Sequence, residues 1–317
     1  MAIPTIETAS KFKTGISVSN SASMAAAGPE LSFTEIKARV SAAIKKVTAI
    51  ATLPEVTTRI ISTVEDPKST AGQLHKIIAH DPALVTRILK IVNSAFYGLP
   101  GQIGSVERAI VLLGLNAVKN LAVAASLGQL FRGVKLCEGF TAKDLWEHCI
   151  SVAITSREIA KQMKQPIGDE AFLAGLIHDV GILVALHVHP EKLQQVCAIV
   201  QKDGGDFCAV ERRICGVDHQ QLGLGLTEAW KFTQACQQAA GHHHQPHATG
   251  EKTHILEAIV YTADILCGQQ KRGFYLTAAQ QQLDPTILES AGITAAVLER
   301  AQANLEPLIQ TALSTLS

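Results

Sequence analysis

The adjacent residues His178 and Asp179 are the pair in this sequence best suited to metal chemistry. They stand inside the otherwise apolar stretch 173–181, which holds no Lys or Arg. A buried Asp is costly unless it is paired or bound to a metal, because its charged form loses its hydration. The compensating positive charge must therefore come from elsewhere, and a metal ion is one source of it.

Further imidazoles and carboxylates stand before and after this pair. His148 lies in an amphipathic stretch, and Asp264 lies among apolar residues in 261–266. Three further candidate ligands, all histidines, fall between the pair and Asp264. A mixed set of this kind suits Mn, Fe, Ni, Zn or Mg, with the geometry deciding. Two ions about 3.5–4 Å apart could clamp a phosphoryl group during hydrolysis. The predicted metal ligands are His148, His178, Asp179, His219, His243, His244 and Asp264.

The remaining histidines are interpreted as ordinary core or surface residues. His80-Asp81 looks like His178-Asp179, but Asp81 is explained as the N-cap of a helix that begins at Pro82. The histidine run before Pro246 is placed in a loop. The other ordinary histidines are His75, His187, His189, His242, His247 and His254.

The elements that must position these ligands are all predicted to be helices. Capping boxes predict helix starts at Ser32 and Thr70, and Gly114 predicts a break between two short helices. No segment alternates apolar and polar residues for long enough to require a strand, so the fold class is all-α. The later predicted helices are 145–164, 169–187, 190–203, 206–215, 220–231, 234–240 and 255–269, followed by two or three short ones with starts at Asp284-Pro285 and Thr294.

The length of 317 residues suggests one large or two medium domains. Residues 1–31 are rich in Ser and Ala without periodicity, which predicts a disordered tail. We expect an N-terminal helical lobe over 32–142, a second lobe with the candidate metal site over 143–275, and a C-terminal helical extension over 276–317.

Composition narrows the class of protein. The 28 basic and 28 acidic side chains balance, which argues against non-specific nucleic-acid binding. Seven cysteines without a Cys-x-x-Cys pair favour a reducing compartment over a disulfide scaffold. The first residues show no secretory signal, and uncharged apolar runs such as 120–131 are shorter than the roughly 20 residues that a membrane span needs. We therefore expect a cytoplasmic protein without a membrane segment.

The order of His148, His178-Asp179 and Asp264 resembles that of the HD superfamily of metal-dependent phosphohydrolases. The stretch from about 53 to 246 resembles more narrowly the HDOD domain, the HD-related output domain of bacterial signalling proteins. This resemblance implies an all-helical fold in two lobes and a role in signal transduction. It rests on the motifs at 53–56, 81–84, 93–98, 109–114 and 176–181, which read LPEV, DPAL, NSAFYG, AIVLLG and LIHDVG.

The resemblance implies two alternative functions. In HD hydrolases the equivalent residues hold one or two metals and a metal-activated water attacks phosphorus, which would make Asp179 catalytic. Related cyclic-dinucleotide phosphodiesterases, however, carry Lys where this chain has Ile182, and Glu with Gly-Tyr-Pro where it has Gln245-Pro246. A missing cation at a phosphoryl-transfer site can cost several kcal/mol of transition-state stabilisation. The favoured function is a signalling output module that binds a partner protein, with 93–100 as the candidate surface, or a nucleotide. The alternative is a phosphohydrolase acting on a nucleotide or cyclic dinucleotide.

Overall fold

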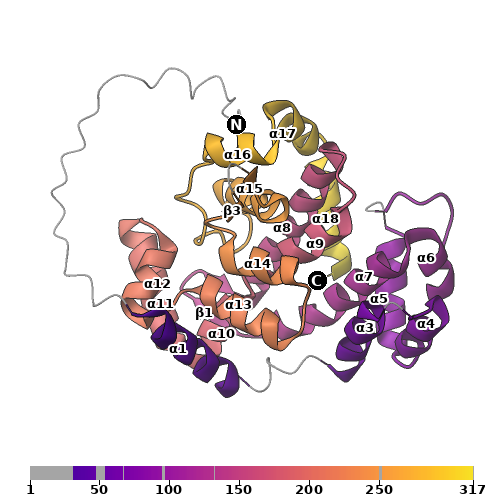
Figure 1. Ribbon diagram of the computed structural model, residues 1–317, viewed down its shortest axis with the longest axis horizontal. Coiled ribbons are helices and arrows are strands. Elements are labelled where there is room, and N and C mark those ends of the chain that lie inside the picture. Colours follow the sequence, from indigo (N-terminus) through magenta and orange to yellow (C-terminus); the bar gives the residue numbers. More distant parts are fainter. Residues whose placement is uncertain are drawn as a thin grey trace.

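The structure of the protein, a computed structural model, describes residues 31–47, 54–66, 68–94, 97–131, 133–249 and 252–316. Within these ranges the regular secondary structure is almost entirely helical, which confirms the predicted all-α class (Figure 1). The predicted tail lies outside the described residues except for Leu31. The first helices are α1 (Phe33–Lys46), α3 (Glu55–Glu65), α4 (Ala71–Ala79), α5 (Pro82–Val92), α6 (Val106–Leu113) and α7 (Leu115–Leu127), followed by the 3₁₀ turn η2 (Gly128–Phe131).

Capping chemistry sets the starts of several of these helices. Capping boxes open α1 at Ser32 and α4 at Thr70, as predicted. The Asp81 carboxylate accepts the Leu84 N–H at 2.9 Å and so caps α5, which confirms its structural role. Gly114 separates α6 from α7 with a φ of 88°, a conformation that favours glycine.

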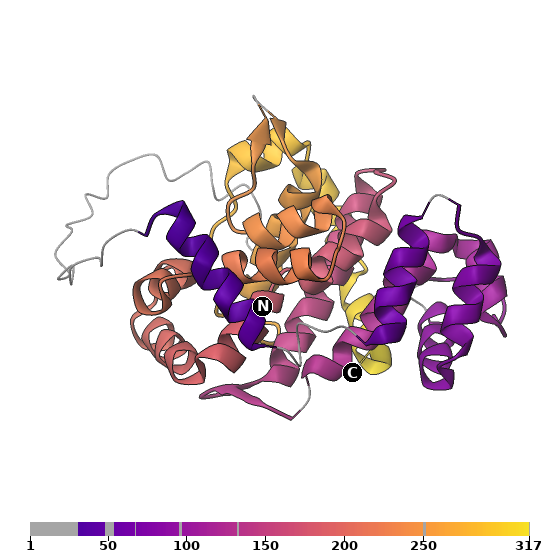
Figure 2. The same cartoon turned by 60° about the horizontal axis from the view of Figure 1, so that its bottom comes forward.

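Helices α3 to α7 form a lobe with a core of its own, on the right in Figure 1. Helix α1 lies apart from them and crosses the larger body, where it packs against α10 and α13 (Figure 2). Its buried Ala43 and the following Val47 belong to the core of the larger body. The domain boundary at 142/143 stays a prediction. The core of the small lobe includes Ile60, Leu74, Ile78, Leu84, Ile88, Val118 and Leu121.

The larger body is built around the long helix α8, which packs against α9, α15, α17 and α18. Its helices are α8 (Ala142–Gln162), α9 (Gly168–Ile177), α10 (Val180–Val188), α11 (Pro190–Asp203), α12 (Phe207–Cys215), α13 (His219–Ala229), α14 (Gln234–His242), α15 (Ile255–Gln269), α16 (Pro285–Ala291), α17 (Ala295–Gln302) and α18 (Leu305–Leu316). Two short antiparallel hairpins complete it, β1 (Lys135–Cys137) with β2 (Phe140–Thr141) and β3 (Ala248–Thr249) with β4 (Lys252–Thr253). Strands this short leave no alternation for sequence reasoning to detect.

The predicted single helix over 169–187 is wrong in one respect, because it is two helices that meet at His178-Asp179. At the break, the His178 ring donates to the Gly175 carbonyl at 2.7 Å, and the Ile182 N–H bonds to the Asp179 carbonyl at 3.0 Å. These bonds accompany the interruption of the helix, and no proline stands at it. The segment Gly168–Val188 is long and apolar enough to cross a membrane, but 89% of its apolar window is buried inside the protein.

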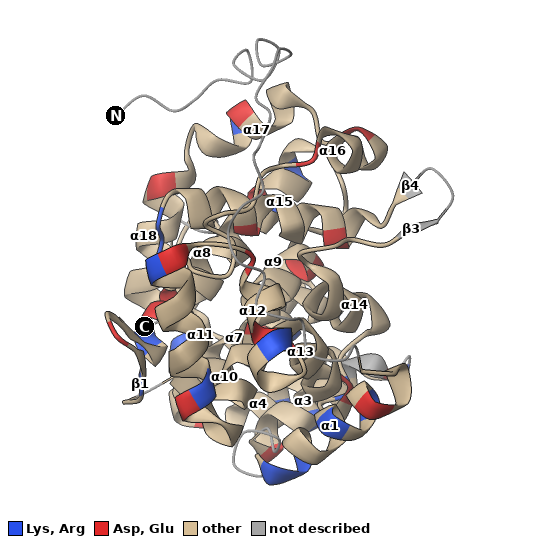
Figure 3. Ribbon diagram, turned by 90° about the vertical axis from the view of Figure 1, so that its left-hand side faces the viewer, with Lys and Arg blue, Asp and Glu red and all other residues tan. Residues whose placement is uncertain are grey.

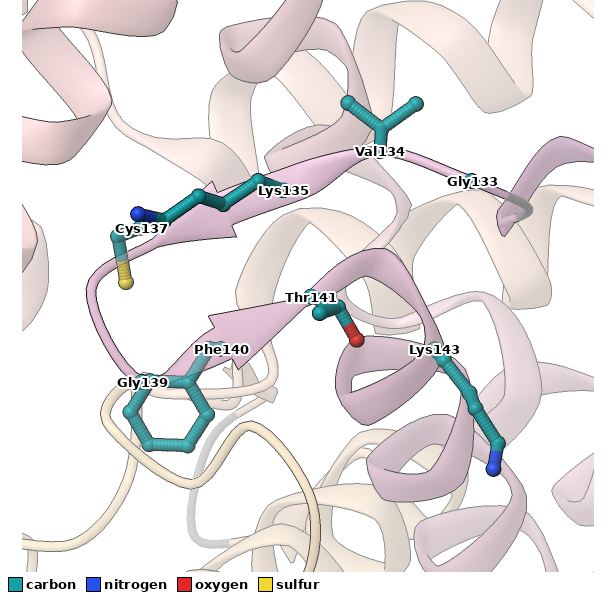
Figure 4. A pocket seen from close by; sticks show the side chains of 8 residues that line it. All are labelled: Gly133, Val134, Lys135, Cys137, Gly139, Phe140, Thr141 and Lys143. Atoms are coloured by element: carbon teal, nitrogen blue, oxygen red, sulfur yellow. The ribbon is translucent and has the colours of Figure 1, made fainter.

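Two surface features carry little chemistry. Blue and red segments are interspersed on the face in Figure 3, in agreement with the zero net charge. A hollow of about 570 Å³ lies along the β1–β2 hairpin (Figure 4), but no imidazole or carboxylate is among its described lining residues.

All seven cysteines are free, as their unpatterned spacing predicted.

Candidate metal centre

All seven predicted ligands gather in one buried group, which we call the inner cluster. They come from α8, the α9–α10 break, the start of α13, the end of α14 and the middle of α15. His244 is the most exposed of them, at 8%. The predicted histidine loop is confirmed for His243 and His244, which lie in the turn after α14, whereas His242 is the last residue of that helix. The inner cluster is His148, His178, Asp179, His219, His243, His244 and Asp264.

One half of the inner cluster combines two imidazoles with two carboxylates. His148 Nε2 lies 3.0 Å from Asp264 Oδ1 and 3.9 Å from Asp179 Oδ2. His178 Nε2 lies 3.5 Å from Asp179 Oδ2 and 3.7 Å from Asp264 Oδ1. These ligand-type atoms are close enough to share one ion.

The other half is richer in imidazole. Asp179 Oδ1 lies 3.3 Å from His219 Nε2 and 3.4 Å from His243 Nε2. His219 Nε2 is also 3.0 Å from His244 Nε2 and 3.3 Å from His243 Nε2. Asp179 therefore belongs to both halves and turns one carboxylate oxygen toward each.

Hydrogen bonds at Nδ1 set the tautomers of four imidazoles. His148, His178 and His243 contact the carbonyls of Arg272, Gly175 and Ala240 at 3.1, 2.7 and 3.1 Å. A carbonyl only accepts, so each of these Nδ1 atoms carries the proton. The fourth, His219, contacts the Glu211 carboxylate at 2.6 Å. A neutral imidazole that donates through Nδ1 presents a lone pair at Nε2, as metal-ligating histidines do.

Several buried atoms of the inner cluster lack a hydrogen-bond partner among the described residues. They are His178 Nε2, Asp179 Oδ1 and Asp264 Oδ2. Buried polar atoms are almost always satisfied, so orphans that face one another require an explanation. A divalent cation accepts lone pairs from all of them and from the neighbouring Nε2 atoms. The residues present therefore fit a metal site.

Within the inner cluster, interactions between charged side chains shift the pKa values of His178 and Asp179 in the direction opposite to burial. Burial alone would lower the pKa of His178, but the carboxylates of Asp179 and Asp264 outweigh it and raise that pKa to about 10. Burial likewise disfavours ionised Asp179, yet His178 and the neighbouring imidazoles hold its pKa well below the usual range. Burial together with His243 lowers the pKa of His244. The site thus keeps its carboxylates ionised, as metal ligands must be.

Sequence reasoning missed several residues that support the ligands. The Gln281 amide donates to His244 Nδ1 at 2.9 Å. Glu211 is 1% exposed, and its Oε2 accepts both the ring Nδ1–H and the backbone N–H of His219, the latter at 2.9 Å. Thr277 donates its hydroxyl to Asp179 Oδ2 at 3.2 Å. A signal for Glu211 was available, because it falls on the apolar face of α12 four residues after Phe207.

A backbone contact brings two of the ligand-bearing helices together. A side chain on Gly181, in the first turn of α10, would place its Cβ 1.9 Å from the His219 carbonyl oxygen. Only glycine permits this approach, which holds His219 against the His178-Asp179 break.

A cavity of about 750 Å³ lies beside the inner cluster, and His244 is the cluster residue in its wall. The wall is polar and contains Gln220, Gln281 and Tyr261. Its cation, Arg212, pairs with Asp218. The cavity gives a small polar ligand a route to the edge of the cluster.

Comparison with known families matches residues 50–246 to the HDOD domain. Among solved structures, an HDOD domain protein of unknown function from Geobacter sulfurreducens shares 22% identity at a TM-score of 0.73, over 89% of this chain and 99% of that one. A protein described as a candidate phosphohydrolase from Shewanella amazonensis shares 24% identity at a TM-score of 0.70, over 88% and 98% of the two chains. A candidate signal transduction protein from Marinobacter aquaeolei shares 22% identity at a TM-score of 0.70. The match covers 89% of this chain and 66% of that one. These likenesses establish the fold.

A curated relative from Treponema pallidum, an uncharacterized protein, is 24% identical over 211 residues. The match covers 66% of this chain and 40% of that protein.

Proposed function

Because the chain belongs to the HDOD domain family, we propose that it is a bacterial signalling module whose inner cluster binds one or two divalent metal ions. The observation that supports this most directly is the convergence of Nε2 atoms with set tautomers on Asp179 and Asp264. The excess of imidazole favours a transition metal such as Mn, Fe, Ni or Zn over Mg. We place the protein in the cytoplasm, where its free cysteines stay reduced.

We assign separate ligands of the inner cluster to two ions. His148, His178 and Asp264 would hold one ion, and Asp179 would serve both. The other ion would be held by His219, His243 and His244. Bound ions would supply positive charge and Lewis acidity to this site. Because the ligands come from several helices, metal binding would fix α8, α10, α13, α14 and α15 relative to one another. Such a dependence of helix packing on metal suits a module that passes on a conformational change.

The surface proposed for a protein partner is the segment 93–100, of which Ala95 and Phe96 lie outside the described residues. Tyr97 and Gly98 line a hollow of about 580 Å³ together with residues of α8 and α9. Arg157 of α8 stacks on the Tyr97 ring at 4.4 Å. A partner that binds here would touch both the small lobe and the helices that carry metal ligands.

A second candidate function is hydrolysis of a phosphoester in a nucleotide or cyclic dinucleotide, with Asp179 as a catalytic residue. The polar cavity beside His244 favours it. The absence of a lysine at Ile182, which is fully buried, weighs against it. Arg212 could supply the missing cation in the cavity only by leaving Asp218.

The test is metal analysis of the purified chain after loading with Mn, Fe or Zn, followed by turnover assays on cyclic dinucleotides and a general phosphodiester. We expect bound metal in the parent chain and its loss from the inner cluster in His178→Ala. His187→Ala is the matched control, because His187 lies on α10 and the hydrogen bond of its ring within the described residues is to the Leu183 carbonyl, at 2.8 Å. Metal without turnover would support the signalling module, and turnover lost with His178 would support the hydrolase. A parent chain without inner-cluster metal would overturn the proposal.

A further inference from the structure

Three histidines interpreted as ordinary from the sequence surround one buried carboxylate outside the inner cluster. We call this group the outer cluster, and it consists of His242, His247, His254 and Glu257. His242 ends α14, His254 caps α15, and Glu257 lies in the first turn of α15. His247 precedes strand β3, and its carbonyl accepts the His254 N–H at 2.9 Å. Hairpin pairing therefore brings residues from two helices and a loop to one place.

The outer cluster has the spacing of a ligand set. One ligand atom each from His242, His247 and Glu257 lie within 4.8 Å of one another. The rings of His242 and His247 are 3.6 Å apart between centroids. His242 Nδ1 contacts the Gln238 carbonyl at 3.1 Å, which assigns the proton to Nδ1 and leaves the lone pair on Nε2.

Glu257 makes this group more than a surface histidine patch. Its side chain is 2% exposed, and its ion pairs within the described residues are with His247 at 3.3 Å and His254 at 3.0 Å, not with Lys or Arg. A buried carboxylate needs a compensating charge, and the backbone N–H of His247, which donates to Glu257 Oε2 at 2.7 Å, carries none. The side chains of His247 and His254 are 45% and 48% exposed, so an ion from solvent can reach the carboxylate.

We propose that His242, His247 and Glu257 form a second, solvent-accessible site for a zinc-like transition-metal ion, separate from the inner cluster. Two imidazole nitrogens and one carboxylate oxygen are a ligand set that Zn²⁺ accepts, with a fourth position left for water. His254 holds the other carboxylate oxygen of Glu257 and so orients it. The family match ends at residue 246, so His247 and Glu257 lie beyond it.

The test is zinc titration of the full chain, prepared without a polyhistidine tag, by calorimetry with metal analysis. We expect His247→Ala to lose one bound Zn²⁺ per chain, or to bind it at least about tenfold more weakly, while the inner-cluster metal remains. His242→Ala should behave the same way. His75→Ala is the matched control, because His75 is also a partly exposed histidine beside a glutamate, 3.1 Å from Glu107.

The experiment tests the proposals for the inner and outer sites independently. In a His178→Ala background, the outer site should still bind Zn²⁺, and Co²⁺ in its place should give visible absorption bands that His247→Ala removes. If the parent and both outer variants bind equal zinc, the outer cluster is only a structural hydrogen-bond group and the inference is wrong. That result would not affect the inner-cluster proposal. The inner-cluster proposal fails only if the parent chain binds no metal in the inner cluster.

Discussion

The inner and outer clusters use the same residue types, and they are joined directly where His242 precedes His243 and His244, yet their surroundings differ. The inner ligands are buried, and imidazoles such as His178 and His243 donate to backbone carbonyls. In the outer cluster His242 has a similar bond to the Gln238 carbonyl, but His247 is 45% exposed and its ring contacts a side chain, Glu257. A hydrogen bond to the backbone of a packed helix orients a ring more firmly than one to another side chain.

The two sites use the same types of ligand, so they differ in how firmly the surrounding residues hold those ligands in place. Ligands held in place lose little freedom on binding a metal, and residues that orient them are worth about 10–100-fold in affinity. We therefore expect the inner cluster to bind tightly and exchange slowly. The outer cluster should bind more weakly and exchange with the medium.

The largest effect should follow from replacing the carboxylate that both inner halves share. Asp179→Asn removes a charged ligand from each half, so we expect inner-cluster affinity to fall by more than about 100-fold while outer-cluster zinc is retained. Metal analysis and calorimetry measure both. Asp169→Asn is the control, since Asp169 lies on α9 and pairs with Arg157 at 3.6 Å. Equal losses from the two clusters would show that they are not separate sites.

The next effect concerns the support of one inner ligand. Glu211→Gln keeps the shape of the side chain but weakens its bond to His219 Nδ1, so we expect about 10–100-fold weaker binding of one inner ion. The matched control is Glu158→Gln, because Glu158 is 8% exposed and bonds to Lys161 and Gln162. Stoichiometry in a zinc titration distinguishes the outcomes. Unchanged affinity in Glu211→Gln would mean that His219 needs no such support.

Much of the fold was predictable because its helices carry local start and stop signals. The predicted ranges 190–203 and 255–269 match α11 and α15 residue for residue. The break at His178-Asp179 was not predictable, because it depends on ring and backbone bonds that form only in the packed protein. The short hairpins were not predicted because strands of two or three residues show no alternation of apolar and polar residues.

The inner ligands could be found from the sequence because charged residues in apolar helices are costly and rare. Asp264, for example, stands between apolar residues on α15 and is fully buried. Glu211 gives the same signal more weakly, because Arg212 and Arg213 follow it on α12. The outer cluster could not be found by that reasoning. His247 and His254 meet only because hairpin β3–β4 pairs their backbones, and their polar surroundings resemble any loop.

A proton-release measurement should sharpen the comparison further. With its pKa raised to about 10, metal-free His178 is protonated at pH 7 and must lose its proton to bind a metal, so inner-cluster affinity should rise with pH up to that value. Burial and the neighbouring His247 lower the pKa of His242, so outer binding should release fewer protons. Calorimetry at pH 7 in two buffers of different ionisation enthalpy measures this, with His247→Ala isolating the inner site and His178→Ala the outer one. Equal release at both sites would contradict the contrast in their electrostatics.

The smallest effect should come from a single neutral donor to an inner ligand. Thr277→Val removes the hydroxyl that donates to Asp179 Oδ2 while keeping the shape of the side chain. One such bond is worth about 1 kcal/mol, so we expect about fivefold weaker inner binding and unchanged outer binding. Thr262→Val is the control, because Thr262 is also buried, lies two residues before Asp264, and donates only to the Ala258 carbonyl at 2.7 Å. If the two variants bind zinc equally, the Thr277 hydroxyl does not orient Asp179. The imidazoles on either side would then be enough to hold that carboxylate.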